Sequence, residues 1–216
     1  MTNSTINGVA VMGRKGGIGK TTFAHLLALG AAWKGVPAYL FHTDDREPLS
    51  VNGRPYGYFD ARDPKDLERL IGAVVNQDGL CIIDSGGNRP KFDQWIAETV
   101  DLVLIPVGPD EEDVVVGLEH MEMLEKAGAK KVRFILNKFP AVKVERDYVE
   151  REYYSRLPID KVIGKMGDVR AVRTLRQSDK PAFQTPPSKV NNLARKLYFT
   201  VKDELDSERE TAIRAA

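Results

Sequence analysis

Cysteine is nearly absent from this sequence, whose 216 residues include a single one, Cys81. One thiol per chain excludes a disulfide framework and any cluster of cysteine metal ligands within the chain. Cys81 lies in the apolar run 80–83. We therefore expect a buried and inert thiol.

Long hydrophobic runs are missing as well. No stretch reaches the ~18 uncharged apolar residues that a membrane-spanning helix requires. Residues 1–7 are polar and lack the apolar core of a signal peptide, and the segment after Leu205 is acidic, so an anionic bilayer would repel it. We therefore expect a cytoplasmic protein with no membrane partner.

What is present is the composition of one ordinary soluble domain, with 42% hydrophobic and 29% charged residues. A chain of this length can bury a sheet-based core without the help of disulfides or metal. The sequence has no internal repeat, low-complexity linker or break in composition. We predict a single domain over residues 1–205, followed by a polar, flexible C-terminal tail over 206–216.

Short apolar runs alternate with longer segments of helical period. This pattern predicts an α/β fold with a doubly wound, mostly parallel sheet and helices on both faces. The expected strands are 8–12, 38–41, 80–83, 102–106 and 132–136, with a short edge strand at 56–60. The expected helices are 20–33, 64–75, 113–127, 145–156, 169–176 and 189–205.

Residues 13–22 read Gly-Arg-Lys-Gly-Gly-Ile-Gly-Lys-Thr-Thr and lie between an expected strand and an expected helix. This is the context of a phosphate-binding loop, in which glycines let backbone N–H groups converge on an anion at a helix N-terminus. Lys20 is expected to lie against the β- and γ-phosphates of a nucleotide, and Thr21 to coordinate Mg²⁺. The full set predicted to bind the nucleotide is Gly16, Gly17, Ile18, Gly19, Lys20, Thr21 and Thr22.

This phosphate loop departs from the plain Walker A pattern, because position 14 is arginine rather than glycine and a second lysine follows at position 15. Lys-Gly-Gly-x-Gly-Lys-Thr resembles the deviant Walker A motif of the ParA/MinD family of ATPases. The resemblance implies that Lys15 reaches across a dimer interface to the nucleotide of the other subunit, so that ATP controls dimerisation. The alternative for Lys15 is a solvated loop lysine. The short segment before Gly13 is similar to that of compact members without an N-terminal DNA-reading domain.

The segment 42–46, which reads His-Thr-Asp-Asp-Arg, follows the second expected strand. The family usually has Asp-x-Asp-Pro-Gln here, and the resemblance implies that Asp44 orients the attacking water near Mg²⁺. The alternative for Asp44 is a carboxylate that caps a helix or a turn. His42, Asp45 and Arg46 depart from the family pattern, which leaves the geometry of this segment open.

The apolar strand 80–83 closes on Asp84. Such a strand end resembles the Walker B motif, whose carboxylate holds Mg²⁺, commonly through a water. Thr21 and Asp84 are therefore the predicted metal ligands. Gly86 and Gly87 stand where the family tends to have Pro-Pro or Pro-Ala, and we expect them to make this loop more flexible.

Two further segments resemble the family's binding site for the base. Asn137 closes an apolar strand, and its side-chain amide would pair with the adenine edge. Pro181 lies in a late loop similar to the one that packs against the base. The alternatives are an ordinary strand-end turn for Asn137 and a helix-breaking loop for Pro181.

The formal net charge of +1 conceals a strong asymmetry along the chain. Residues 1–125 carry 11 Lys+Arg and 19 Asp+Glu, residues 126–202 carry 19 and 7, and residues 203–216 carry 2 and 5. The middle segment therefore has an excess of twelve positive charges, whereas the flanking ones are acidic. An excess of this size predicts a polyanionic partner.

Arg170, Arg173 and Arg176 recur every three residues and would share one face of a helix. One interpretation is an ordinary solvated charged face. The other is nonspecific contact with DNA phosphates, in which Lys196 of the last helix would take part. ParA-like proteins bind chromosomal DNA in this way as ATP dimers, so the resemblance favours DNA.

Taken together, the resemblance implies a ParA-like ATPase that uses ATP and Mg²⁺ and forms a homodimer when ATP-bound. It would hold nonspecific DNA, associate with the nucleoid, and position a plasmid, a chromosome region or a protein assembly. A cargo-bound activator, ParB-like or an adaptor, would stimulate slow hydrolysis by Lys15, Lys20 and Asp44. An alternative is a metabolic ATP-dependent ligase of the dethiobiotin synthetase type, in which Lys15 has no evident role.

Overall fold

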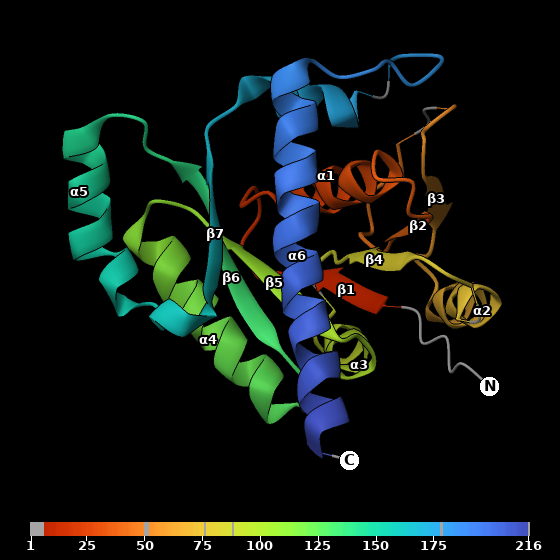
Figure 1. Ribbon diagram of the computed structural model, residues 1–216, viewed down its shortest axis with the longest axis horizontal. Coiled ribbons are helices and arrows are strands. Elements are labelled where there is room, and N and C mark those ends of the chain that lie inside the picture. The colour runs from red at the N-terminus through yellow and green to blue at the C-terminus, as the bar shows by residue number, and fades with distance from the viewer. Residues whose placement is uncertain (1–6, 50–51, 76, 88, 178, 216) are drawn as a thin grey trace.

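The computed structural model describes residues 7–49, 52–75, 77–87, 89–177 and 179–215. Strands and helices alternate along most of this part of the chain (Figure 1). The strands are β1 (Asn7–Val11), β2 (Ala38–His42), β3 (Gly57–Asp60), β4 (Leu80–Asp84), β5 (Leu102–Val107), β6 (Val132–Phe139) and β7 (Val162–Gly167). The α-helices are α1 (Lys20–Ala32), α2 (Pro64–Val74), α3 (Pro90–Thr99), α4 (Glu111–Lys126), α5 (Lys143–Glu152) and α6 (Ser188–Ala215), and short 3₁₀ turns are η1 (Tyr154–Arg156), η2 (Ile159–Lys161) and η3 (Arg170–Arg176).

The strands form one sheet in the order β3-β2-β4-β1-β5-β6-β7, and every pairing is parallel. The predicted doubly wound parallel sheet is therefore confirmed, as are the predicted strands. Two elements escaped the sequence pattern. β7 contains two glycines and only one buried residue, Met166, so it lacks an apolar run. α3 begins at Pro90 and buries only two apolar residues, Ile96 and Ala97, which is too few for a clear helical period.

Two predicted helix assignments were wrong. Residues 170–176 form a 3₁₀ turn, η3, rather than an α-helix. The last helix does not end near Leu205 but continues to Ala215. Its continuation past Leu205 contains no glycine or proline to stop it, and the ion pair between Lys202 and Asp206 joins successive turns.

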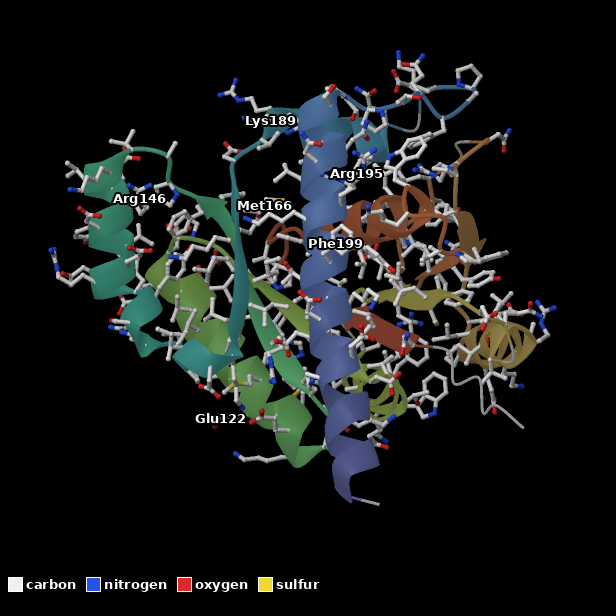
Figure 2. All side chains as sticks on the ribbon, viewed as in Figure 1. Glu122, Arg146, Met166, Lys189, Arg195 and Phe199 are labelled. Carbon is white, nitrogen blue, oxygen red and sulfur yellow. The ribbon has the colours of Figure 1, made fainter. Side chains whose placement is uncertain are left out.

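Helices cover both faces of the sheet because side chains alternate along each strand. Val9 and Val11 of β1 face a core formed with α1 and α6, whereas Ala10 and Met12 face a core formed with α2, α3, α4 and α5. Figure 1 shows α6 crossing the strands on one face, and Met166, labelled in Figure 2, lies in the core between β7 and α6. Cys81 is buried in the second core, as expected, and burial raises the pKa of its thiol to about 12.

The strand order reverses direction at β1, with β4, β2 and β3 on one side and β5, β6 and β7 on the other. In open parallel sheets a crevice forms outside the carboxyl ends of the strands at this switch point. The loops that follow β1, β2, β4, β5 and β6 therefore meet at one edge of the sheet. Of the predicted site residues near the strand ends, Asp44 lies in the loop after β2, Asp84 is the last residue of β4, and Asn137 lies in β6 near its carboxyl end.

Gly30 tests the packing of α1 against α6. A Cβ atom at Gly30 would lie 2.1 Å from the carbonyl oxygen of Ala194. Alanine usually stabilises a helix interior by ~1 kcal/mol relative to glycine, but overpacking a close contact costs about 1–3 kcal/mol. We expect Gly30→Ala to lower the free energy of unfolding in urea denaturation.

Gly72 of α2 is the matched control, because it is an exposed helical glycine with no heavy atom within 4 Å of the added Cβ. Gly72→Ala should raise the free energy of unfolding by about 0.5–1 kcal/mol. A stabilised Gly30→Ala variant would contradict the close approach of the two helices.

Candidate functional site

The phosphate loop (residues 13–22) connects β1 to the N-terminus of α1 at the switch point. Gly19 is the N-cap of α1 and has φ +106°, a conformation that residues with a Cβ rarely adopt. A Cβ at Gly19 would also lie 2.6 Å from the Asn137 side-chain nitrogen. The loop is therefore shaped by two constraints, backbone conformation and the close approach of β6, and its N–H groups lie at the positive end of α1.

Lys20 is buried at the start of α1, with 8% of its surface exposed. Its Nζ donates a hydrogen bond to the Lys15 carbonyl oxygen at 3.1 Å. Burial lowers the pKa of Lys20, while the nearby Asp84 and Asp44 carboxylates oppose that effect. The ammonium group is thus held at the phosphate loop by a single backbone oxygen, a contact that an anion could replace.

Lys15 is held within its own subunit. Its Nζ lies 2.6 Å from Asp113 Oδ1 and 2.7 Å from Glu112 Oε2, both in the first turn of α4. Hydrogen bonds to these two carboxylates raise the pKa of Lys15. Lys15 is therefore not the solvated loop lysine of the alternative interpretation, because its amine is paired with two carboxylates of α4.

Asp84 ends β4 beside the phosphate loop. In the sheet, Asp84 pairs in register with Val11 of β1 and His42 of β2. The carboxylate is buried, and neither oxygen has a hydrogen-bond partner among the described residues. The closest cation is the His42 ring, whose Nδ1 lies 3.7 Å from Asp84 Oδ2.

His42 is itself tied to the switch segment by a 2.8 Å contact between Nε2 and the Arg46 carbonyl oxygen. Burial lowers the pKa of His42, but the Asp84 carboxylate and this carbonyl outweigh burial and raise it overall. The imidazole thus packs locally between the two acidic segments.

The orphaned Asp84 carboxylate fits a Mg²⁺ site. An unpartnered buried carboxylate is costly unless a cation or a hydrogen-bond donor reaches it. Within the described residues no group of three or more His, Cys, Asp or Glu side chains could hold a metal by itself. Mg²⁺ is usually bound by one or two protein groups together with substrate phosphates and water, so a single buried carboxylate is enough to take part in such a site.

Asp44 lies just beyond β2 and forms a bidentate pair with Arg46. Arg46 Nη2 donates to Asp44 Oδ2 at 2.7 Å, and Arg46 Nε and the Arg46 backbone N–H both donate to Oδ1 at 3.1 Å. Hydrogen bonding to the Arg46 side chain lowers the pKa of Asp44 to about 2. Asp44 is thus placed as a turn carboxylate, the alternative considered from the sequence, and its role in orienting water stays a prediction.

The loop after β4 packs closely against both neighbours. A Cβ at Gly87, which has φ +76°, would lie 2.4 Å from the Gly13 carbonyl oxygen and 3.5 Å from Lys20 Nζ. A Cβ at Gly86 would lie 2.9 Å from the Asp44 Cα atom. Close approach, in addition to the expected flexibility, therefore explains glycine at these positions.

Sequence reasoning missed Arg89, which joins this loop to the segments after β2 and β3. Its guanidinium donates to the Thr43 and Arg62 carbonyl oxygens and lies 3.7 Å from Asp45 Oδ1. No motif pointed to Arg89, because its backbone partners become neighbours only in the folded sheet.

Asn137 buttresses the phosphate loop. Its Nδ2 donates to the Ile18 carbonyl oxygen at 2.7 Å, and its Oδ1 accepts from the Lys138 N–H at 2.9 Å. Lys138 has φ +52° where the pairing of β6 with β7 shifts register between Leu136 and Phe139. The structure thus brings Asn137 to the site, and pairing with adenine remains a prediction.

A cavity of about 230 Å³ opens beside the phosphate loop. One wall belongs to the loop and α1, through Gly17, Gly19, Lys20, Thr21 and Thr22. The other walls are Arg46, Asn137, Lys138 and the segment from Met166 to Arg176, including Arg170, Arg173 and Arg176. The three arginines predicted to contact DNA therefore lie at the rim of the phosphate-loop cavity.

Pro181 is not among the residues that line this cavity. Its neighbours Ala182 and Phe183 line a second cavity together with Arg54, and the Phe183 N–H donates to the Asn52 carbonyl oxygen at 2.6 Å. The structure does not bring this loop to the phosphate loop, so contact between Pro181 and the base stays a prediction.

Part of the basic segment is neutralised within the chain. Ion pairs with acidic side chains are formed by Lys130, Lys161, Lys165, Arg156 and Arg133. Among the described residues, Arg170, Arg173, Arg176 and Lys196 have no ion-pair partner, and all four are exposed. Figure 2 also shows Lys189 and Arg195 on the outer face of α6. These cations remain free for an external anion.

No helix in the described ranges combines the length and apolar character needed to cross a membrane. No protein-family model matches the sequence. The chain is 26% identical over 122 residues to the curated protein ParA of Rhizobium radiobacter, an alignment that covers 54% of this chain and 55% of ParA. It thus spans about half the length of that relative.

Solved structures share the fold across most of the chain. The Cyanothece McdA–ATP complex has a TM-score of 0.69 at 13% identity and covers 92% of this chain and 97% of its own. The cell division ATPase MinD of Pyrococcus furiosus has a TM-score of 0.63 at 18% identity, covering 91% and 98%. A Borrelia burgdorferi putative plasmid partition protein bound to AMPPNP has a TM-score of 0.64 at 13% identity, covering 90% and 98%.

These low identities show a common fold, and the alignment with ParA adds a relative in sequence. The phosphate loop supplies the most specific feature, a lysine five residues before the Walker lysine in a Lys-Gly-Gly-x-Gly-Lys-Thr motif. Motif, alignment and fold agree in making the chain similar to the ParA/MinD family of deviant Walker A ATPases.

Proposed function

We propose that this chain is a ParA-like ATPase that binds Mg·ATP at the carboxyl edge of β1 and hydrolyses it slowly. The observation that carries the proposal is the meeting of a glycine-rich loop, a buried lysine and an unpartnered buried carboxylate at one switch point. Lys20 would bind the β- and γ-phosphates, and Thr21 and Asp84 would hold Mg²⁺. The metal would offset phosphate charge as the terminal phosphate is transferred to water.

Dimerisation would follow from Lys15. In the ligand-free subunit its charge is neutralised by Asp113 and Glu112 of α4. A triphosphate on a facing subunit offers several anionic oxygens at one point, so the amine would exchange its carboxylate partners for phosphate oxygens when two ATP-loaded chains meet. ATP would therefore control the dimer, which would be a homodimer built face to face around two nucleotides.

The output of the cycle would be positional. The ATP dimer would pool the unpaired cations of two subunits on nonspecific DNA, and a cargo-bound activator would stimulate hydrolysis and release it. The curated relative is named ParA, and one solved structure is a putative plasmid partition protein, which supports a role in partition. Plasmids, chromosome regions and protein assemblies remain the candidate cargoes.

The Walker lysine tests nucleotide binding. Lys20→Ala should abolish measurable ATP binding in isothermal titration calorimetry, because the buried ammonium group is the principal positive side chain at the loop. Lys126→Ala removes an exposed lysine at the end of α4 and should leave ATP binding unchanged. Retained affinity in Lys20→Ala would remove the phosphate-loop assignment.

Lys15 tests the dimer. Lys15→Gln should still bind ATP but remain monomeric in light scattering coupled to size-exclusion chromatography, because no cation would reach the partner's triphosphate. Arg14→Gln alters the neighbouring residue, whose side chain is exposed and only weakly paired with Glu119 at 4.0 Å. This control should dimerise with ATP. Dimerisation of Lys15→Gln would refute the role in trans.

The rim arginines test DNA binding. Replacing Arg170, Arg173 and Arg176 together by glutamine should weaken DNA binding in fluorescence anisotropy and flatten its salt dependence. The slope of log K against log salt should fall by about 0.9 for each lost phosphate contact. ATP affinity is measured in parallel, since these residues also line the phosphate-loop cavity. Unchanged DNA affinity would refute the DNA contact and favour the alternative interpretation, in which these arginines form an ordinary solvated charged face.

A further inference from the structure

We propose that Arg46 is a second phosphate-binding cation, supplied by the same subunit. When ATP binds, its guanidinium would break its pair with Asp44 and bind the terminal phosphate of the nucleotide. Its departure would free the Asp44 carboxylate to orient the attacking water. The inference rests on the proposed binding and hydrolysis of ATP. It adds a residue for which the family pattern, with glutamine at this position, provides no charge.

Arg46 is placed to reach the phosphates. Its side chain lines the same cavity as Gly17, Lys20 and Thr21 of the phosphate loop. The charge of Arg46 contributes to lowering the pKa of Lys20, and the Asp84 carboxylate contributes to raising the pKa of Arg46, so all three groups lie near one another. An anion bound between Lys20 and Asp84-held Mg²⁺ would therefore lie within the electrostatic reach of Arg46.

Little besides Asp44 restrains the guanidinium. The Arg46 side chain is 80% exposed, whereas that of Asp44 is 11% exposed. Its two side-chain hydrogen bonds go to Asp44, and no other described residue forms an ion pair with it. The guanidinium can thus rotate away while the Arg46 backbone N–H keeps its bond to Asp44 Oδ1.

The pair also occupies most of the acceptor capacity that Asp44 would need for its expected role. The Arg46 side chain and backbone N–H together take three of the roughly four acceptor sites of the carboxylate, and a guanidinium that left would return two of them to a water molecule. A planar guanidinium fits two phosphate oxygens as well as two carboxylate oxygens. The triphosphate carries more charge than one carboxylate, so the exchange of partners is electrostatically favourable once ATP is bound.

The proposed step then balances. The oxygen of a water molecule that donates a hydrogen bond to Asp44 forms a bond to the γ-phosphorus. The bond from that phosphorus to the β–γ bridging oxygen breaks, and ADP keeps the electron pair. The water proton ends on the released phosphate, while Arg46 and Lys20 stabilise the charge on the transferred group.

The chain supplies a close internal control. Arg62 pairs with Asp60 in the same way, two residues apart, through Nε and Nη2 and through a backbone N–H to Oδ1 at 3.2 Å. Arg62 does not line the phosphate-loop cavity. Arg62 also pairs with Glu47. Arg62→Ala therefore removes a similar local pair, and one further ion pair, without removing a cation from the site.

The first test is the affinity for ATP relative to ADP, measured with fluorescent analogues at fixed Mg²⁺. Arg46→Ala should weaken ATP binding about 10- to 100-fold, the value of a charge-assisted hydrogen bond, and weaken ADP binding less than about 2-fold. Arg62→Ala should change neither. Equal losses for ATP and ADP, or no loss, would overturn the inference, because a merely structural role does not distinguish the terminal phosphate.

The second test is turnover. Arg46→Ala should lower kcat about 100-fold or more, and Arg46→Lys should recover part of that loss. If Arg46→Ala unfolds at a lower temperature than the parent, Arg46→Gln, which carries the family residue, takes its place. A parent protein that binds neither nucleotide would overturn the proposed function itself. If the parent binds and hydrolyses ATP and the Arg46 variants do so with the same affinity and kcat, only this inference would be overturned.

Discussion

Parallel pairing of β1 with β4 and β5 is the constraint on which the site depends. It brings the carboxyl ends of neighbouring strands to one edge, where loops from distant parts of the chain come within hydrogen-bond distance. The phosphate loop alone could be a glycine-rich turn. Beside the unpartnered Asp84 carboxylate and the Asn137 amide, it becomes a pocket with both a cation and a buried carboxylate that could hold a metal ion.

The ligand-free pocket holds its cations in local pairs. Lys15 is bound by Asp113 and Glu112, Arg46 is bound by Asp44, and Lys20 donates to a backbone carbonyl. The carboxylates offset the charge of Lys15 and Arg46, whereas Lys20 has only a hydrogen bond to a neutral carbonyl. In the proposed cycle, phosphate oxygens would replace each of these partners.

The basic half of the chain is divided by the fold into two groups. Several of its lysines and arginines pair with acidic side chains from other elements, such as Lys161 with Glu125 of α4 and Arg133 with Glu204 of α6. The arginines of η3 are unpaired among the described residues and border the phosphate-loop cavity. The proposed nucleotide site and the proposed anion-binding turn would therefore be adjacent in space, which a count of charges along the chain could not reveal.

The sequence by itself determined the parallel α/β architecture, the phosphate loop and the acidic strand ends, because these depend on local patterns: apolar runs, glycine spacing, and a polar residue directly after a buried strand. It did not predict β7 or α3, whose apolar residues are too few, nor the contacts of Lys15, Arg46 and Arg89. Only the tertiary structure decided those contacts. The order of strands across the sheet sets which loop ends become neighbours, and the ion pairs formed there depend on that order rather than on distance along the chain.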